Sequence, residues 1–84
     1  MIGQYQTTDM MCAATLRALG FELKELSWSG KRASFVFEYS QVNGNLTPEQ
    51  YIQEFWNKRI QIDARTLLEA EKELKTRVKT ELVG

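Results

Sequence analysis

The clearest hydrophobic pattern in this chain is a strict alternation over residues 33–39. Phe35, Phe37 and Tyr39 occupy alternate positions within it. Side chains of a β-strand point alternately to its two faces, so the pattern predicts a strand with one aromatic face. That face needs a cover, and helices packed on one side of a short sheet supply it most economically.

A second strand is expected just before it, over residues 21–28. Its apolar residues change parity between Leu23 and Leu26. The change predicts either a β-bulge near Glu25 or a strand that is apolar on both faces over part of its length. A serine and a glycine follow and favour a tight turn. We therefore expect a hairpin formed by residues 21–28 and 33–39.

Three segments have helical periodicity together with helix start signals. The first follows Asp9, an N-cap candidate, and stops at Gly20, which suits the left-handed position after a helix. The second opens with a capping box from Thr47 to Gln50, with proline at the first helical position. The third follows Asp63 and extends for about 19 residues, or roughly 28 Å.

The first two helices each gather their apolar residues on one face, which we expect to be buried. On the first helix this face comprises Met11, Cys12, Thr15, Leu16, Ala18 and Leu19. On the second helix it comprises Tyr51, Ile52, Phe55 and Trp56.

Two further segments favour extended structure. Residues 4–7 alternate and predict a short first strand, and Ile60 and Ile62 suggest a short extended piece before the last helix. Residues 43–45, Asn-Gly-Asn, predict a mobile loop tip. The expected fold is α+β, with the order β-α-β-β-α-(β)-α and a mostly antiparallel sheet packed on helices, in a single domain over residues 1–84. Which strand lies at the edge does not follow from the pattern.

The composition narrows the possible chemistry. The chain is 43% hydrophobic and 26% charged, within the range of globular domains. It has no histidine, which excludes imidazole bases and histidine metal sites. Cys12 is the only cysteine, so we expect a buried, unreactive thiol and no disulfide. Asp9 and Asp63 are better explained as helix caps than as catalytic carboxylates. We expect no enzymatic activity, no metal and no cofactor.

Charge and hydropathy bear on location and partners. Eleven Lys and Arg balance eleven Asp and Glu, so no overall attraction to nucleic acid or to an anionic membrane is expected. The first residues lack a signal-peptide pattern, and no apolar run approaches the ~20 residues of a membrane span. We expect a cytoplasmic protein.

The last helix contains an anomaly. Its apolar arc runs through Ala64, Leu67, Leu68, Leu74, Val78 and Leu82. Glu71 and Lys75 fall inside this arc, where charges are costly unless they are paired. A half-covered apolar stripe is typical of a partner-binding surface, either for a foreign protein or for a second copy of the chain. The predicted contact residues are Glu71, Leu74, Lys75, Val78 and Leu82. The alternative is a helix that frays after Arg77.

A second hypothesis is an accessory nucleic-acid-binding protein. Trp28 precedes Lys31 and Arg32, and an aromatic residue beside cations can stack on a base and contact phosphate. A solvated hairpin end with the tryptophans packed in the core is the simpler interpretation. A third hypothesis is a protein that sequesters a small molecule in an aromatic pocket.

Several features together resemble a known family. They are Tyr5-x-Thr7-x-Asp9, Ala13-Ala14, Leu16, Leu19-Gly20-Phe21, Phe35-Val36-Phe37, Asp63, Leu67-Leu68 and the final ELK. Over about residues 5–75 the chain resembles a family of small bacterial and phage domains of unknown function, close to this chain in length. The resemblance implies a phage or mobile-element setting with a regulatory or counter-defence role, in the host cytoplasm if phage-encoded. It supplies no catalytic residues.

Overall fold

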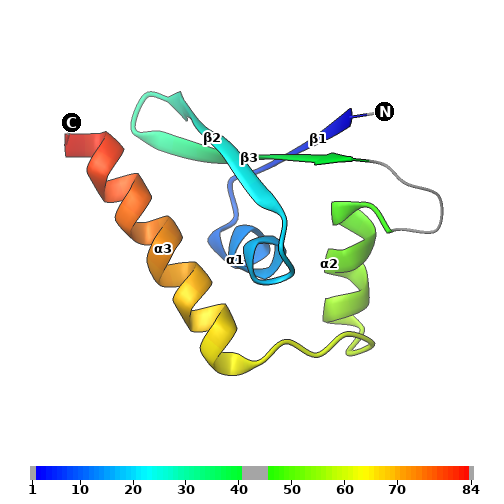
Figure 1. Ribbon diagram of the computed structural model, residues 1–84. Helices are drawn as coiled ribbons and strands as arrows, with labels where there is room; N and C mark the ends of the chain where they lie inside the picture. The colour runs from blue at the N-terminus through cyan, green and yellow to red at the C-terminus, as the bar shows by residue number, and fades with distance from the viewer. Residues whose placement is uncertain (1, 41–45, 84) are drawn as a thin grey trace.

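A computed structural model describes residues 2–40 and 46–83 and shows a three-stranded sheet above three helices (Figure 1). The elements are β1 (Ile2–Thr7), α1 (Met10–Ala18), β2 (Glu22–Ser29), β3 (Arg32–Ser40), α2 (Pro48–Trp56) and α3 (Ala64–Val83). The α+β fold and the element order agree with the sequence expectation. The extended piece expected at Ile60 and Ile62 is not a strand. Its segment joins α2 to α3 at the end of the molecule away from the sheet, so no strand is there to pair with it. The predicted loop tip at 43–45 lies outside the described residues.

β3 is the central strand of the sheet. The strand order is β1-β3-β2, and both pairings are antiparallel. The register of β2 against β3 shifts between Leu23 and Glu25, which agrees with the first of the two expected alternatives, an irregularity near Glu25. Gly30, at a φ of 62°, provides the left-handed position that the hairpin turn requires. Phe35 and Phe37 are buried on the helix side. The opposite face is mostly polar, and no helix covers it in Figure 1.

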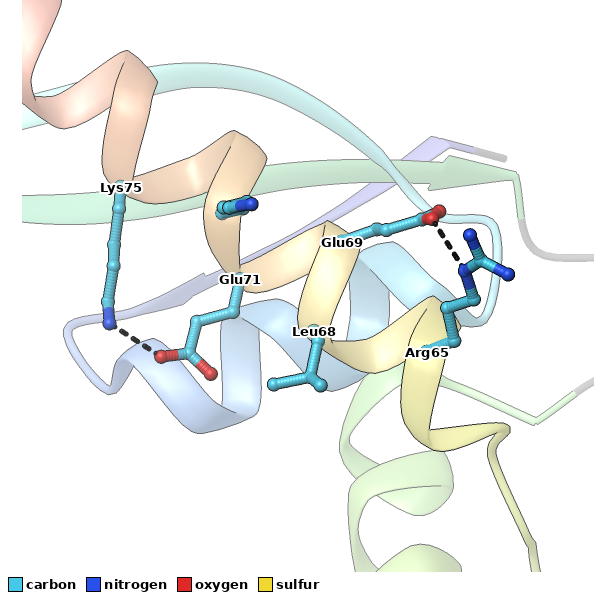
Figure 2. Close-up of a pocket in the computed structure, with 6 residues that line it drawn as sticks. Arg65, Leu68, Glu69, Glu71 and Lys75 are labelled. Carbon is cyan, nitrogen blue, oxygen red and sulfur yellow. Dashed lines mark ion pairs between the residues drawn. The ribbon is translucent and has the colours of Figure 1, made fainter.

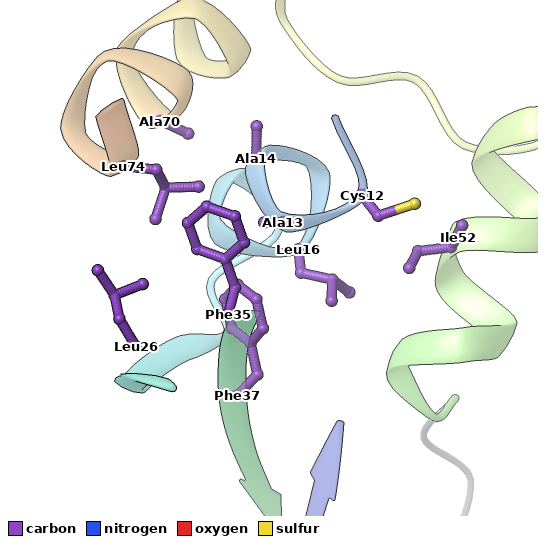
Figure 3. Close-up of a cluster of buried hydrophobic side chains, with 10 residues drawn as sticks. All are labelled: Cys12, Ala13, Ala14, Leu16, Leu26, Phe35, Phe37, Ile52, Ala70 and Leu74. Carbon is purple, nitrogen blue, oxygen red and sulfur yellow. The ribbon is translucent and has the colours of Figure 1, made fainter. Parts of the chain in front are cut away.

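α1 is the centre of the helical layer. Its start is capped by Asp9, whose Oδ1 accepts hydrogen bonds from the amides of Met11 at 2.8 Å and Cys12 at 3.2 Å. The helix packs between α2 and α3 beneath the sheet, as Figure 3 shows. Ala13 and Ala14 are fully buried, whereas Met11, which was expected in the core, is 46% exposed. α1 has neighbours on several sides. Its most closely packed positions are therefore the small residues Ala13 and Ala14, which allow the neighbouring elements to approach, and the longer side chain of Met11 lies outside.

α2 begins and ends with defined caps. The expected capping box at Thr47 is present, with Gln50 as its partner. At the other end Lys58 adopts a φ of 61°, and the amide of Arg59 donates to the carbonyl of Glu54 at 2.9 Å. The amide of Lys58 also donates to Phe55, completing a Schellman motif. A lysine thus occupies the position that glycine usually takes.

The buried part of α2 is smaller than its apolar arc predicted. Ile52 is buried and lies beside Cys12 of α1 in Figure 3. Trp56 is 61% exposed, so the expectation that this side chain packs in the core was wrong. The last turn of α2 extends past the surface that α1 offers, which leaves the indole without a cover.

α3 runs the length of one side of the molecule. Asp63 caps it, accepting a hydrogen bond from the amide of Thr66 at 3.2 Å. Arg17 of α1 lies 2.9 Å from Glu73, an ion pair between two helices that pack side by side. The helix continues to Val83, so it does not fray after Arg77.

Candidate functional site

The nucleophiles and acids of the chain are arranged as structural groups. Cys12 is buried, and this burial, followed by the negative charge of Asp9, raises the pKa of its thiol. Burial likewise raises the pKa of Tyr5, with Cys12 and Glu49 adding to the effect. Both side chains therefore stay protonated near neutral pH. Across residues 2–40 and 46–83, no three side chains of the metal-ligating types come together.

The apolar arc of α3 divides into a buried half and an exposed half. Leu74 is fully buried, and Leu67 and Val78 are partly buried against the same core. Leu68 and Leu82 are 65% and 57% exposed. Leu74 was predicted to contact a partner, and the structure corrects this, because the side chain is enclosed within its own chain. α1 lies to one side of the arc rather than beneath its middle, so the opposite side is left open.

Glu71 and Lys75 lie at the boundary between these halves. Their charged atoms are 2.7 Å apart, and their side chains are 26% and 63% exposed. Figure 2 shows this pair beside Leu68, with the Arg65–Glu69 pair on the neighbouring side of the helix. The two charges within the apolar arc are thus paired and partly solvated, which lowers the cost of their burial.

The open side of α3 carries a row of cations. Six residues separated alternately by three and four positions form what we call the outer face of α3: Arg65, Leu68, Lys72, Lys75, Lys79 and Leu82. Lys75 pairs with Glu71, and Arg65 lies 3.6 Å from Glu69. Lys72 and Lys79 form no ion pair within the described part of the chain. The sequence interpretation missed these two lysines, although the same spacing applied to cations as well as leucines indicates them.

Two shallow hollows adjoin this face. One, of about 490 Å³, is lined by α3 residues alone among those that the structure describes, so it is a strip of helix surface rather than an enclosed cavity. The other, of about 330 Å³, lies where Met10 of α1 meets Val78 of α3, and lysines border it. Lys72 and Lys75 line both hollows, which makes them neighbouring parts of one surface.

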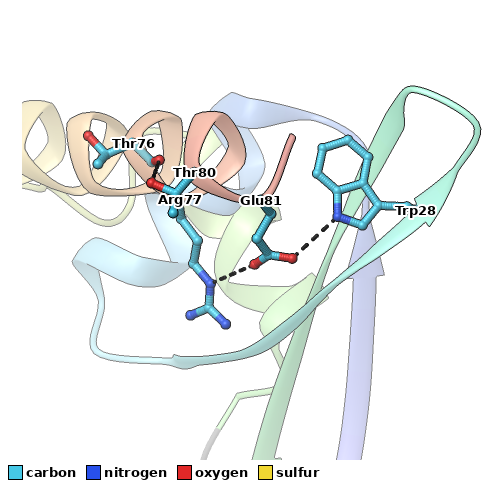
Figure 4. A network of polar contacts seen from close by, with 5 residues as sticks. All are labelled: Trp28, Thr76, Arg77, Thr80 and Glu81. Carbon is cyan, nitrogen blue, oxygen red and sulfur yellow. Dashed lines mark hydrogen bonds and ion pairs between the residues drawn. The ribbon is translucent and has the colours of Figure 1, made fainter. Parts of the chain in front are cut away.

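The hairpin end does not have the arrangement that the nucleic-acid hypothesis requires. Lys31 and Arg32 are exposed at the turn, but Trp28 is partly buried against the core. Its Nε1 donates to Oε1 of Glu81 at 3.3 Å, and the other oxygen of Glu81 lies 3.3 Å from Nε of Arg77 (Figure 4). The indole is directed toward α3 and is not presented beside the two cations.

Comparison with known families assigns the chain to a family. The family model described as a domain of unknown function, DUF5659, matches residues 3–80 of the 84 residues. The chain belongs to the DUF5659 family. The resemblance to small domains of unknown function is therefore confirmed. Searches of curated proteins and of solved structures found no match. The family description assigns no activity to this DUF5659 domain, so its function must be inferred from its own surface.

Two remaining features of the DUF5659 domain bear on the other hypotheses. Leu19, Gly20, Phe21 and Tyr51 line a hollow of about 260 Å³, where the two aromatic rings meet edge to face at 5.6 Å. It lies below the ~300–1,000 Å³ range typical of small-molecule pockets. No helix in the described residues is long and apolar enough to cross a bilayer.

Proposed function

We propose that this DUF5659 domain is a non-enzymatic interaction module that binds a foreign protein through the outer face of α3. The observation that carries the proposal is the exposure of Leu68 and Leu82, each more than half accessible, on a face that the chain's own core leaves uncovered. Leucines at helical spacing on an uncovered helix face, with lysine methylene stems between them, offer anchor positions of the kind used in helix-mediated protein contacts.

The length of α3 supports this proposal. α3, at 20 residues, offers a face about 30 Å long.

The charges of this face disfavour a second copy as the partner. A symmetric antiparallel pairing through the outer face would set Lys72 of one copy opposite Lys75 of the other. Like charges brought together in an interface cost free energy, and a symmetric contact would repeat that cost. A foreign partner avoids the repulsion. A regulatory or counter-defence role in a phage or mobile element is the setting we propose from the family resemblance.

The experiment is a two-hybrid selection against proteins of the native host and its mobile elements. It compares Leu68→Glu with the matched control Gln6→Glu, since Gln6 is exposed on β1, away from α3. Leu68→Glu also places a carboxylate four residues before Lys72, an arrangement that favours the helix. We expect Leu68→Glu to abolish the selected interaction and Gln6→Glu to retain it. If Leu68→Glu keeps every partner, the proposed surface is wrong.

A further inference from the structure

We infer that the segment bound by α3 is an acidic amphipathic helix that lies lengthwise on the outer face. Its carboxylates would pair with Lys72 and Lys79, and its apolar side chains would cover Leu68 and Leu82. The inference rests on the proposed function, and it adds the chemistry and the shape of the partner.

The charge argument begins with the lysines. Lys72, Lys75 and Lys79 follow one another at spacings of three and four, so they are neighbours on one helix face. Lys75 has Glu71 as its partner, whereas Lys72 and Lys79 form no ion pair in the described residues. Like charges at these spacings repel one another in the free protein. Carboxylates from a partner relieve that repulsion and pair with the two lysines at the same time.

The spacing of the face suits a helical partner. From Arg65 to Leu82 the positions alternate between steps of three and four, an average period of about 3.5. A seam with this period stays in contact with a second helix at a shallow crossing angle over several turns. A strand rises about 3.3 Å per residue and presents alternate side chains to one face. The spacing of these side chains would not match the spacing of the contact residues along α3.

An apolar floor gives the partner's side chains a place to pack. Met10 and Val78 are partly buried, and they line the hollow of about 330 Å³ together with the three lysines. The methylene stems of lysines cover apolar surface while their ammonium groups stay in water. A partner side chain of the size of leucine would pack in the hollow against Met10 and Val78, and carboxylates on either side of it would face the lysines at its border.

Neither nucleic acid nor a membrane fits the same face as well. The outer face, Met10 and Val78 include no aromatic side chain, so base stacking has no platform there. A helix that lies in a membrane interface presents a broad apolar side to the lipid. α3 uses its main apolar side, with Ala70 and Leu74 at the centre, inside its own core.

The test uses the full chain and two synthetic helical peptides. The first carries Leu and Glu at alternating three- and four-residue spacing, and the second replaces every Glu with Lys. Fluorescence anisotropy compares wild type, Lys72→Glu/Lys79→Glu and the control Lys31→Glu/Arg32→Glu, whose changes lie at the exposed hairpin turn. We expect the Leu/Glu peptide to bind wild type and the control equally. The double lysine variant should bind it about tenfold or more weakly, since two attractions become repulsions.

Binding of the Leu/Glu peptide should weaken with added salt. The inference is overturned if the double lysine variant binds this peptide as wild type does, or if the Leu/Lys peptide binds equally well. It is also overturned if single-stranded oligothymidylate or phosphatidylserine vesicles bind more tightly than the peptide. Circular dichroism melts establish that each variant is folded. A selected partner that Leu68→Glu loses but the double lysine variant keeps would leave the proposed function standing and remove this inference.

Discussion

The indole Nε1 of Trp28 donates a hydrogen bond to Oε1 of Glu81, 3.3 Å away and 53 positions later in the chain. The contact joins the end of the β2–β3 hairpin to the last turns of α3 (Figure 4). Arg77 holds the second oxygen of the same carboxylate. The C-terminal part of the helix, which carries Lys79 and Leu82, is therefore positioned by a strand element rather than left as a solvated tail.

Removing this carboxylate should loosen the end of α3. We expect Glu81→Ala to increase amide exchange over residues 78–83 and to shift tryptophan emission to the red, because the end of the helix loses its contact with Trp28. Both groups are close to the surface, so the free energy of unfolding should fall by no more than about 1 kcal/mol. Glu69→Ala, at an exposed acid on the same helix, is the control. Unchanged exchange in Glu81→Ala would show that the helix end needs no such anchor.

The two halves of the α3 arc should respond to the same substitution with very different losses of stability. Leu74→Ala removes a fully buried side chain, and we expect the free energy of unfolding to fall by about 2–5 kcal/mol. Leu82→Ala changes a side chain that is 57% exposed and should stay within about 0.5 kcal/mol of wild type. Urea unfolding measures both. Equal losses in the two variants would contradict the division of the arc.

Lys58 offers a site where stability can be gained. A φ of 61° costs an L-residue about 1–2 kcal/mol, whereas glycine adopts it without steric cost. Glycine also loses more backbone entropy on folding, so the net gain from Lys58→Gly should be about 1 kcal/mol. The neighbouring Asn57, at a φ of −83°, supplies the control, since Asn57→Gly should destabilise. A lower urea midpoint for Lys58→Gly would refute the expected gain.

Alkaline pH should weaken the fold through Cys12. Burial raises the pKa of this thiol above its ordinary value of 9.0, so the folded chain holds the proton more tightly than the unfolded chain. The free energy of unfolding is then fully retained below about pH 9 and declines as the pH rises through the folded-state pKa. Tyr5, whose pKa is raised above 10.0, acts in the same direction at higher pH.

Urea midpoints between about pH 8 and pH 10.5 measure this decline. Cys12→Ala should be less stable at every pH but should show a flatter profile over that interval. The native thiol should also react slowly with a disulfide reagent and rapidly after unfolding. Fast labelling of the folded protein would restore the possibility of a reactive cysteine.

Interactions between close neighbours in the chain made much of the fold predictable. A cap joins a side chain to an amide two or three residues away, so Asp9, Thr47 and Asp63 mark their helices without reference to the rest of the molecule. The alternation through Phe35 and Phe37 likewise reflects the geometry of a single strand. These signals survive in any tertiary arrangement that keeps the elements.

The tertiary structure decided which apolar faces are covered and which polar groups meet. β3 lies at the centre of the sheet, α1 covers Leu74 but not Leu68, and Trp56 extends beyond its neighbours. Trp28 meets Glu81 only because the hairpin and α3 converge. Helical periodicity identifies an apolar arc, but the fraction of the arc that is buried depends on the position and size of elements distant in sequence. The sequence by itself therefore determined the elements and their caps, and long-range packing determined the surface that remains open to a partner.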